Sequence, residues 1–411
     1  MTAQSSAAPL AHRRSWGFAA MLASLSMLGP FAVDMYLPAF PAMGAEFGVP
    51  ALALQQTLSV YMIAYAIMML WHGALSDALG RRPVVLVGLA VFALGTLGCA
   101  IAGNIQSLWL FRVLQGLSAG AGLVVGRAII RDRFHGPEAQ RMMSQTTLVF
   151  GLGPALAPIV GGALLNLFGW RSIFWAMFLW TIVMIVVCVR ALPETHPPAN
   201  RHPLRPRAMW RNYRHVLGRP AFSLLALLLG FNFCAFFLYI AAAPAFLVDR
   251  LGVSTWGFAW LFVPMIAGIM IGAFLSGRIA GRISPVRTIR IGYAVLAAAC
   301  VINLAISYLL SPQVAWNVLP IFVYTIGSSL IMPSVTLLLL DLFPTMRGMT
   351  SSLQGFVQFA LGAVIAGSIA PLLAHGLTSL AWGMAAFTAA SFALWLMYHR
   401  HASPALKEST I

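Results

Sequence analysis

Long apolar stretches separated by short polar breaks run through almost the whole chain. Stretches such as Val183–Val187 and Leu224–Leu229 are apolar on every side, whereas strands of a membrane barrel alternate apolar and polar residues. A helix needs about 20 mostly apolar residues to cross a bilayer. The pattern therefore predicts twelve membrane-spanning helices, at residues 16–38, 51–72, 84–103, 107–128, 143–165, 172–190, 220–243, 257–276, 289–310, 316–340, 350–373 and 380–398.

Composition supports a polytopic membrane protein and excludes several other classes. Of the 411 residues, 60% are hydrophobic and 8% are charged, whereas a soluble domain carries roughly 25% charged residues. Disordered chains are poor in apolar residues, so the same values exclude disorder. The net charge of +16 does not indicate a nucleic-acid-binding protein, because the soluble scaffold of such a protein is missing.

The basic residues predict the orientation of the spans. With both termini in the cytosol, 22 of the 25 Lys and Arg residues face the cytosol, and the exceptions are Arg112, Arg171 and Arg250. This asymmetry is the positive-inside pattern. The first span follows Arg13 and Arg14, and its length favours a retained helix over a cleaved signal peptide.

The chain divides into two halves of six spans. The expected units are an N-terminal six-helix bundle (1–190), a basic cytosolic linker (191–219), a C-terminal six-helix bundle (220–400) and a cytosolic tail (401–411). Leu75–Arg82, after the second span, is similar to Leu275–Arg282, after the eighth. Six-helix repeats of this kind form the two bundles of secondary transporters, with the substrate site between them near the midplane.

The short connection between spans two and three carries a motif that we interpret as a gating latch. Gly80 suits the C-terminal cap of a helix, but Asp77 opposes the dipole at a helix C-terminus and therefore needs a partner. We expect that partner to be Arg131, Arg133 or the start of span eleven near Met349. The motif residues are Gly73, Leu75, Asp77, Gly80, Arg81 and Arg82.

Six stretches together resemble a known family. The connection just described resembles the loop 2–3 signature of the major facilitator superfamily, and the N-terminal half resembles its Bcr/CflA subfamily of drug:proton antiporters with twelve spans. The matching stretches are Asp34–Pro41, Gly73–Pro83, Leu110–Gly116, Arg127–Asp132, Gly153–Gly162 and Gly169–Trp175, and Arg347–Ser352 adds support from the C-terminal half. The resemblance implies proton-driven efflux of drugs or small metabolites across a bacterial inner membrane.

Two charged residues fall within predicted spans at positions away from their cytosolic ends. Asp34 lies about 27 Å along span one and Arg112 about 8 Å from the outer end of span four, at 1.5 Å per residue, so both occupy the outer half of the bilayer. Charges at this depth commonly mark ion or substrate pathways. We interpret Asp34 as the proton-coupling residue and Arg112 as the residue that tunes its proton affinity. The alternatives are a structural ion pair, or side chains that snorkel to the interface.

Span five resembles the antiporter motif of drug exporters. Small residues allow helices to approach closely, and prolines bend a helix, so this span is expected to form a tight contact between the two halves. General packing explains the glycines nearly as well. The residues concerned are Gly153, Pro154, Pro158, Gly161 and Gly162.

A ligand cavity needs apolar and aromatic walls with a few polar groups. Residues at helical spacing on spans two and seven, with one glutamine of span eleven, could supply these walls. The alternative for each is core packing, or the aromatic belt for Tyr239. The candidates are Tyr61, Tyr65, Asn232, Phe236, Tyr239 and Gln358.

The sequence carries no nucleotide-binding loop, hydrolase motif or metal-ligand spacing, so we expect a monomeric transporter of protons and small molecules without a metal or cofactor, and not an enzyme. Two rivals stay open. One is a proton–substrate symporter that imports a nutrient, and the other is a membrane enzyme that acts on lipid. We expect no nucleic-acid partner for the basic linker.

Overall fold

The computed structural model describes residues 7–134, 136–201, 204–280, 282–344 and 346–401, and the regular structure within these ranges is helical. The expected tail lies outside the described residues from position 402 onward. The elements before the linker are α1 (Ala7–Asp34), η1 (Leu37–Ala39), α2 (Phe40–Phe47), α3 (Ala51–Leu79), α4 (Arg81–Ala100), α5 (Ile105–Arg133), α6 (Gly136–Phe168) and α7 (Arg171–Ala191). Those that follow are η2 (Pro198–Asn200), α8 (Pro206–Leu217), α9 (Pro220–Ala241), η3 (Pro244–Arg250), η4 (Thr255–Phe258), α10 (Ala259–Ile279), α11 (Pro285–Leu309), α12 (Val314–Asp341), α13 (Arg347–Val364), η5 (Ile365–Ile369), α14 (Ala370–Leu373) and α15 (Leu377–His401).

Eleven helical stretches among the described residues are long and apolar enough to cross a membrane. Helix α6 adds the shorter apolar stretch Leu156–Phe168 within its 33 residues. These twelve segments correspond one to one with the expected spans. The all-helical, twelve-span fold expected from the sequence is therefore confirmed.

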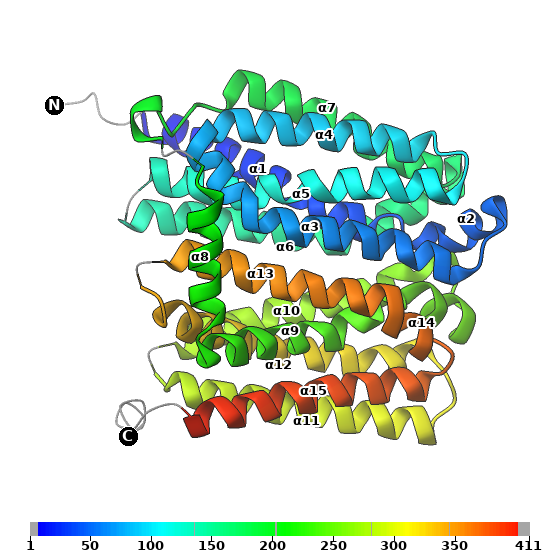
Figure 1. Ribbon diagram of the computed structural model, residues 1–411. Coiled ribbons are helices and arrows are strands. Elements are labelled where there is room, and N and C mark those ends of the chain that lie inside the picture. Colours follow the sequence, from blue (N-terminus) through cyan, green and yellow to red (C-terminus); the bar gives the residue numbers. More distant parts are fainter. Residues whose placement is uncertain (1–6, 135, 202–203, 281, 345, 402–411) are drawn as a thin grey trace.

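The helices form two groups that lie side by side (Figure 1). In the first group α3 and α4 pack against α5, and α1 packs against α6; in the second, α10 and α11 pack against α12, and α9 packs against α15. The groups meet mainly where α3 contacts α13 and where α6 contacts α10. Any movement of one bundle against the other must occur along these two seams.

Near its beginning, α3 is joined by hydrogen bonds to the end of α13 and to η5, which continues α13. Gln56 donates to the carbonyl of Gly367 at 2.7 Å, and Ser59 donates to the carbonyl of Ala363 at 2.8 Å. Figure 1 places α8 at the opposite end of the same helices. The two bundles are thus tied together by side chains at the end of the molecule away from α8.

Helix α8 crosses both bundles at one end (Figure 1). Its buried residues Tyr213 and Val216 face the bundles, and the Tyr213 hydroxyl donates to the carbonyl of Leu70 in α3 at 2.8 Å. Burial raises the pKa of the Tyr213 phenol to about 12, so this donor keeps its proton at neutral pH. The basic linker 191–219 thus contains a helix, and its apolar residues at 209, 213 and 216 follow helical spacing.

Candidate functional site

The first span is interrupted next to Asp34. Asp34 is the last residue of α1, and the chain bends at Met35 and Tyr36 before η1 begins. Pro38 explains the break, because in a continuous helix its ring would clash with the carbonyl of the residue four positions earlier, which is Asp34. Broken helices in transporters leave backbone groups free near substrate and ion sites. The predicted coupling residue therefore lies at a break in its helix.

Arg112 lies between two tyrosine rings from different elements. Its guanidinium carbon is 4.3 Å from the ring centroids of both Tyr36 and Tyr61, and the residue is 0% exposed. Tyr36 shares a hydrogen bond of 2.9 Å with Thr57, and Tyr61 donates to the carbonyl of Gly29 at 3.0 Å. The rings are fixed in place, so the cation occupies an aromatic cage.

The hydrogen bonds of Arg112 are incomplete. Its Nη1 donates to Gln115 Oε1 at 2.8 Å, and Gln115 in turn donates to Thr96 at 2.7 Å. Its Nε makes a long contact of 3.5 Å with the Thr57 carbonyl. Nη2 is enclosed but has no partner among the described residues. Because arginine keeps its proton in proteins, the site holds a permanent positive charge with one unused donor group.

Asp34 is also without a partner. The residue is 5% exposed and has no hydrogen bond or ion pair to any described residue. Asp34 and Arg112 both lie within electrostatic range of Tyr61. They share one region without forming the ion pair that we considered as an alternative.

The partner expected for Asp77 was wrong. Asp77 pairs with Arg81, one turn further along the chain, with Oδ1 and Nη1 2.5 Å apart. The Nε of Arg81 also pairs with Asp132 at the end of α5, at 3.0 Å. Arg81 opens α4 just across the turn at Gly80, so the motif supplies its own partner, and neither Arg131, Arg133 nor the start of α13 is needed.

A carboxylate from the linker completes this connection. Glu194 accepts hydrogen bonds from the backbone N–H groups of Arg81 and Arg82, at 3.0 and 3.3 Å. These N–H groups open α4, where an acid is favourable. Gly80 has φ +100, and a Cβ there would crowd Glu194. Gly73 and Leu75 are partly buried within α3.

Two glycines of the α6 motif pack against α1 and the bend that follows it. A Cβ on Gly161 would collide with the carbonyl of Met35, and one on Gly153 would touch Met27 at 3.2 Å. Helix α6 also contacts α10 of the second bundle, and the role of the motif in a tight contact between the two halves stays a prediction. Pro154 and Pro158 lie inside α6, and the carbonyl of Gly162 accepts a hydrogen bond from Asn166 at 2.7 Å.

A line of aromatic rings crosses the seam between the bundles. Tyr65 lies 6.1 Å from Tyr61 in its own helix and 4.5 Å from Phe359 in α13, measured between ring centroids. Phe359 lies 6.2 Å from Phe233, which is 5.3 Å from Phe236. The structure thus brings three of the candidate cavity residues together, through two aromatic residues that the sequence did not single out. Gln358, beside Phe359 in α13, is half-buried.

Two other cavity candidates lie inside the second bundle. Asn232 accepts a hydrogen bond from Ser328 through its side-chain oxygen, and Tyr239 accepts one from Asn303 at 2.6 Å. Both side chains are buried, at 0% and 1% exposure. These contacts agree with the packing alternative, and the role of both residues in a cavity stays a prediction.

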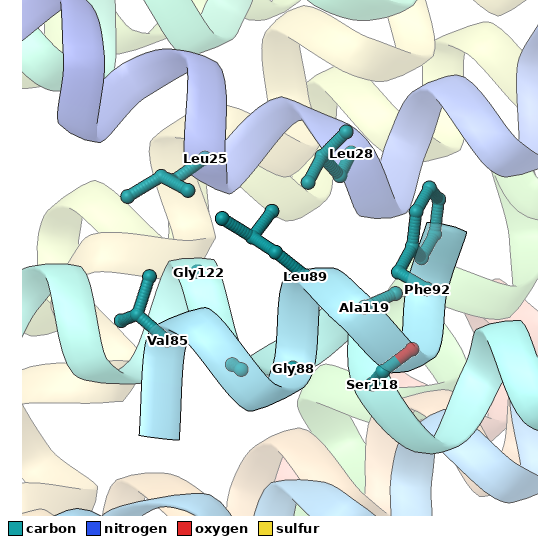
Figure 2. A pocket seen from close by; sticks show the side chains of 10 residues that line it. Leu25, Leu28, Val85, Gly88, Leu89, Phe92, Ser118, Ala119 and Gly122 are labelled. Carbon is teal, nitrogen blue, oxygen red and sulfur yellow. The ribbon is translucent and has the colours of Figure 1, made fainter. Parts of the chain in front are cut away.

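Figure 2 shows a hollow between α1, α4 and α5, lined by Leu25, Leu89, Phe92 and their neighbours. Its volume is about 10 Å³, which holds one water molecule at most. We interpret it as a packing gap. Among the described residues, no cluster of His, Cys, Asp and Glu is suited to hold a metal ion.

Comparison with known proteins gives a consistent result. The sequence profile of the Major Facilitator Superfamily matches residues 22–367. The chain belongs to the major facilitator superfamily. Its relatives include the uncharacterized MFS-type transporter YdgK of Bacillus subtilis, 32% identical over 84% of this chain and 86% of the relative. The bicyclomycin resistance protein homolog of Haemophilus influenzae is 30% identical over 86% and 89%, and multidrug resistance protein D of Escherichia coli is 26% identical over 86% and 88%.

Solved structures of the superfamily confirm the fold. A bacterial homolog of the human lysosomal transporter Spinster, in an inward-facing and occupied conformation, superposes with a TM-score of 0.73. It is 18% identical, over 95% of this chain and 97% of the other. This chain is therefore a multi-pass membrane protein with the major facilitator fold.

Several residues of this superfamily member escaped the sequence analysis. Gln115 lies one turn from Arg112, and that spacing was a usable signal for a partner. Glu194 is the one acid of the basic linker 191–219, and this isolation could have marked it as a partner for basic groups. Tyr36 and Tyr61 had no such signal as cage residues, because they reach Arg112 from the bend after α1 and from α3.

Proposed function

We propose that this chain is a proton-coupled antiporter that exports drugs or small metabolites by alternating access. It operates as a monomer in a bacterial inner membrane, with both termini and α8 in the cytosol. The observation that carries the proposal is the buried carboxylate of Asp34, which lies at the break in the first span, has no partner among the described residues and shares the neighbourhood of Tyr61 with the incompletely bonded guanidinium of Arg112. Relatives named for multidrug and bicyclomycin resistance support export as the direction.

Proton binding and substrate binding exclude one another at Asp34 in this mechanism. An ionised carboxylate inside the membrane is costly, so Asp34 is charged only while the fixed cation Arg112 or a bound substrate compensates for it. A proton that enters from the outside neutralises Asp34 and weakens the hold on the substrate, which leaves. The loss of that proton to the cytosol prepares the site again.

The seams between the bundles provide the alternating movement. The hydrogen bonds from Gln56 to η5 and from Ser59 to α13 hold the end away from α8 closed in this conformation. In the opposite conformation these bonds break, and the ends of the bundles near α8 approach each other. The Asp77–Arg81–Asp132 group lies at that end of α3 and α5, where it positions the helices that close.

Asp34→Asn tests the coupling. The variant keeps the size of the side chain but cannot ionise, so we expect it to reach the membrane in normal amounts and to lose transport driven by a pH gradient. A resistance panel that includes bicyclomycin, in a pump-deficient host, identifies a substrate. Inverted vesicles with an acid interior then measure its accumulation.

Asp249→Asn is the matched control, because Asp249 is an exposed acid at the end of η3 in the second bundle. We expect it to transport at the wild-type rate. Undiminished pH-driven transport by Asp34→Asn would refute the coupling role. Substrate accumulation in right-side-out vesicles under an inward proton gradient would establish import instead.

A further inference from the structure

Helix α8 borders two hollows of opposite character. One has a volume of about 420 Å³ and apolar walls that come from α8, from the inner part of α3 and from the beginning of α13. The walls include Leu70, Trp71, Met209, Trp210, Leu353 and Phe356. Its size lies within the range of about 300–1,000 Å³ that is typical of ligand pockets. The second hollow is lined by Arg205, Arg207 and Arg211 and shares Pro206 with the first.

The three arginines of the second hollow and Arg214, one turn after Arg211 in α8, have no acidic partners among the described residues. Neither Arg205, Arg207, Arg211 nor Arg214 has a side-chain hydrogen bond or ion pair to any residue that the structure describes, and all four are exposed. By contrast, the nearby Arg201 pairs with Glu194 at 3.7 Å. Four unneutralised guanidinium groups within ten positions of the chain attract an anion strongly.

Large apolar groups lie exposed beside these cations. Trp210 is 64% exposed and Leu217 is 44% exposed. A helix with a basic face and an apolar face that carries Trp and Leu lies in the interface of a membrane. The occupant that fits both hollows must carry an anionic group next to a long apolar chain.

We propose that α8, with the adjoining surfaces of α3 and α13, binds an anionic phospholipid of the leaflet on its side of the membrane. The acyl chain lies in the apolar hollow, and the phosphate contacts Arg205, Arg207 and Arg211. Arginine suits this role because its planar guanidinium makes paired hydrogen bonds to phosphate oxygens. The site is separate from Asp34 and Arg112, so it does not depend on the proposed coupling mechanism.

The position of this lipid gives it a structural consequence. Leu70 and Trp71 belong to the first bundle, whereas Leu353 and Phe356 belong to the second. A lipid chain between them contacts both sides of the seam between α3 and α13. Bound lipid therefore stabilises the arrangement of the bundles in which these surfaces lie together.

Native mass spectrometry of the purified full-length protein tests the site, because it counts bound lipids and protein copies in one measurement. The probe is dioleoyl phosphatidylglycerol, compared with dioleoyl phosphatidylcholine at equal concentrations. We expect one phosphatidylglycerol to be retained preferentially. The triple variant R205Q/R207Q/R211Q is expected to bind it at least tenfold more weakly, since exposed arginines can be replaced without loss of folding.

The variant R278Q/R287Q/R290Q is the matched control. It removes the same charge from exposed positions at the end of α10 and the start of α11, and we expect its lipid affinity to stay within twofold of the wild type. Trp210→Ser tests the apolar hollow alone. It should weaken retention of phosphatidylglycerol severalfold while all the arginines remain.

Each other outcome overturns the proposal. Equal losses in both triple variants would mean that overall charge, and not this site, attracts the lipid. Equal retention of phosphatidylcholine would remove the role of the arginines. If millimolar inorganic phosphate raised the unfolding temperature as much as phosphatidylglycerol does, the site would bind phosphate and not a lipid. If the protein formed a dimer without lipid, and Trp210→Ser abolished that dimer, a second copy of the chain would occupy this face.

Discussion

The two bundles share one architecture but differ in what they bury. The first bundle buries Asp34, Arg112 and His72. One nitrogen of His72 and one of Arg112 have no partner among the described residues, and the same holds for Nδ2 of Asn232 in the second bundle. In the described part of the second bundle, the acidic and basic side chains lie at helix ends. Its interior contains neutral pairs such as Tyr239–Asn303 at 2.6 Å and Tyr293–Ser391 at 2.8 Å.

The difference indicates that the two halves of a duplicated fold can have different functions. Buried charges are expensive and are kept where they serve function, whereas neutral hydrogen-bonded pairs mainly fix the packing of a bundle. We therefore infer that proton coupling belongs to the first bundle and that the second bundle provides a rigid surface against which it moves. The three predictions below test that division.

The largest effect is expected from Arg112→Met. The change removes the cation between Tyr36 and Tyr61 and leaves Gln115 Oε1 with only the weak thiol donor of Cys99, so we expect a loss of about 2–4 kcal/mol in stability. Transport driven by a pH gradient should fall at least tenfold for each folded molecule. Thermal unfolding in detergent and vesicle transport, both normalised to the amount of folded protein, provide the two measurements.

Asn232→Leu is the counterpart in the second bundle. It removes a buried amide that accepts a hydrogen bond from Ser328, and it should lower the unfolding temperature while transport per folded molecule stays within twofold of the wild type. An equal loss of transport in both variants would end the functional distinction between the bundles.

The topology could be predicted from the sequence because the bilayer acts on local stretches. Each span must satisfy its own backbone hydrogen bonds and match the membrane thickness, so the composition of a short window decides it. The interruption after Asp34 could also have been predicted, since Pro38 cannot follow it in a continuous helix. The pairing of Asp77 with Arg81 was equally local.

The long-range part of the site could not be predicted from the sequence. The cage around Arg112 combines Tyr36, from the break in span one, with Tyr61 of α3, and nothing in either local pattern specifies their meeting. The same holds for the position of Gly161 against Met35. Such contacts depend on helix rotation and crossing, which packing of the whole bundle decides.

A smaller effect is expected from Gly161→Ala. The new methyl group would press on the carbonyl of Met35, next to Asp34, and overpacking of this kind costs about 1–3 kcal/mol. Because the strain falls on the break in span one, we expect transport per folded molecule to drop severalfold as well. Thermal unfolding and vesicle transport measure the two effects separately.

Gly272→Ala applies similar crowding in the second bundle, where the added methyl group would press on Ile326 and Ser329. We expect a comparable loss of stability without a change in transport per folded molecule. If Gly272→Ala slowed transport as much as Gly161→Ala, tight packing in general would limit the rate, and the break beside Asp34 would have no special role.

The smallest effect is expected from Tyr239→Phe. The change removes one hydroxyl, and Asn303 loses the acceptor that lies 2.6 Å from its Nδ2, so stability should fall by about 1 kcal/mol. If Tyr239 only fixes the packing of the second bundle, the substrate KM stays at the wild-type value. In that case the double variant Tyr239→Phe/Asn303→Ala is also no less stable than Asn303→Ala alone. A raised KM at unchanged stability would instead place the hydroxyl in the substrate cavity. Such a result would give the second bundle a share of substrate recognition, and the division between the bundles would then hold for the proton but not for the cargo.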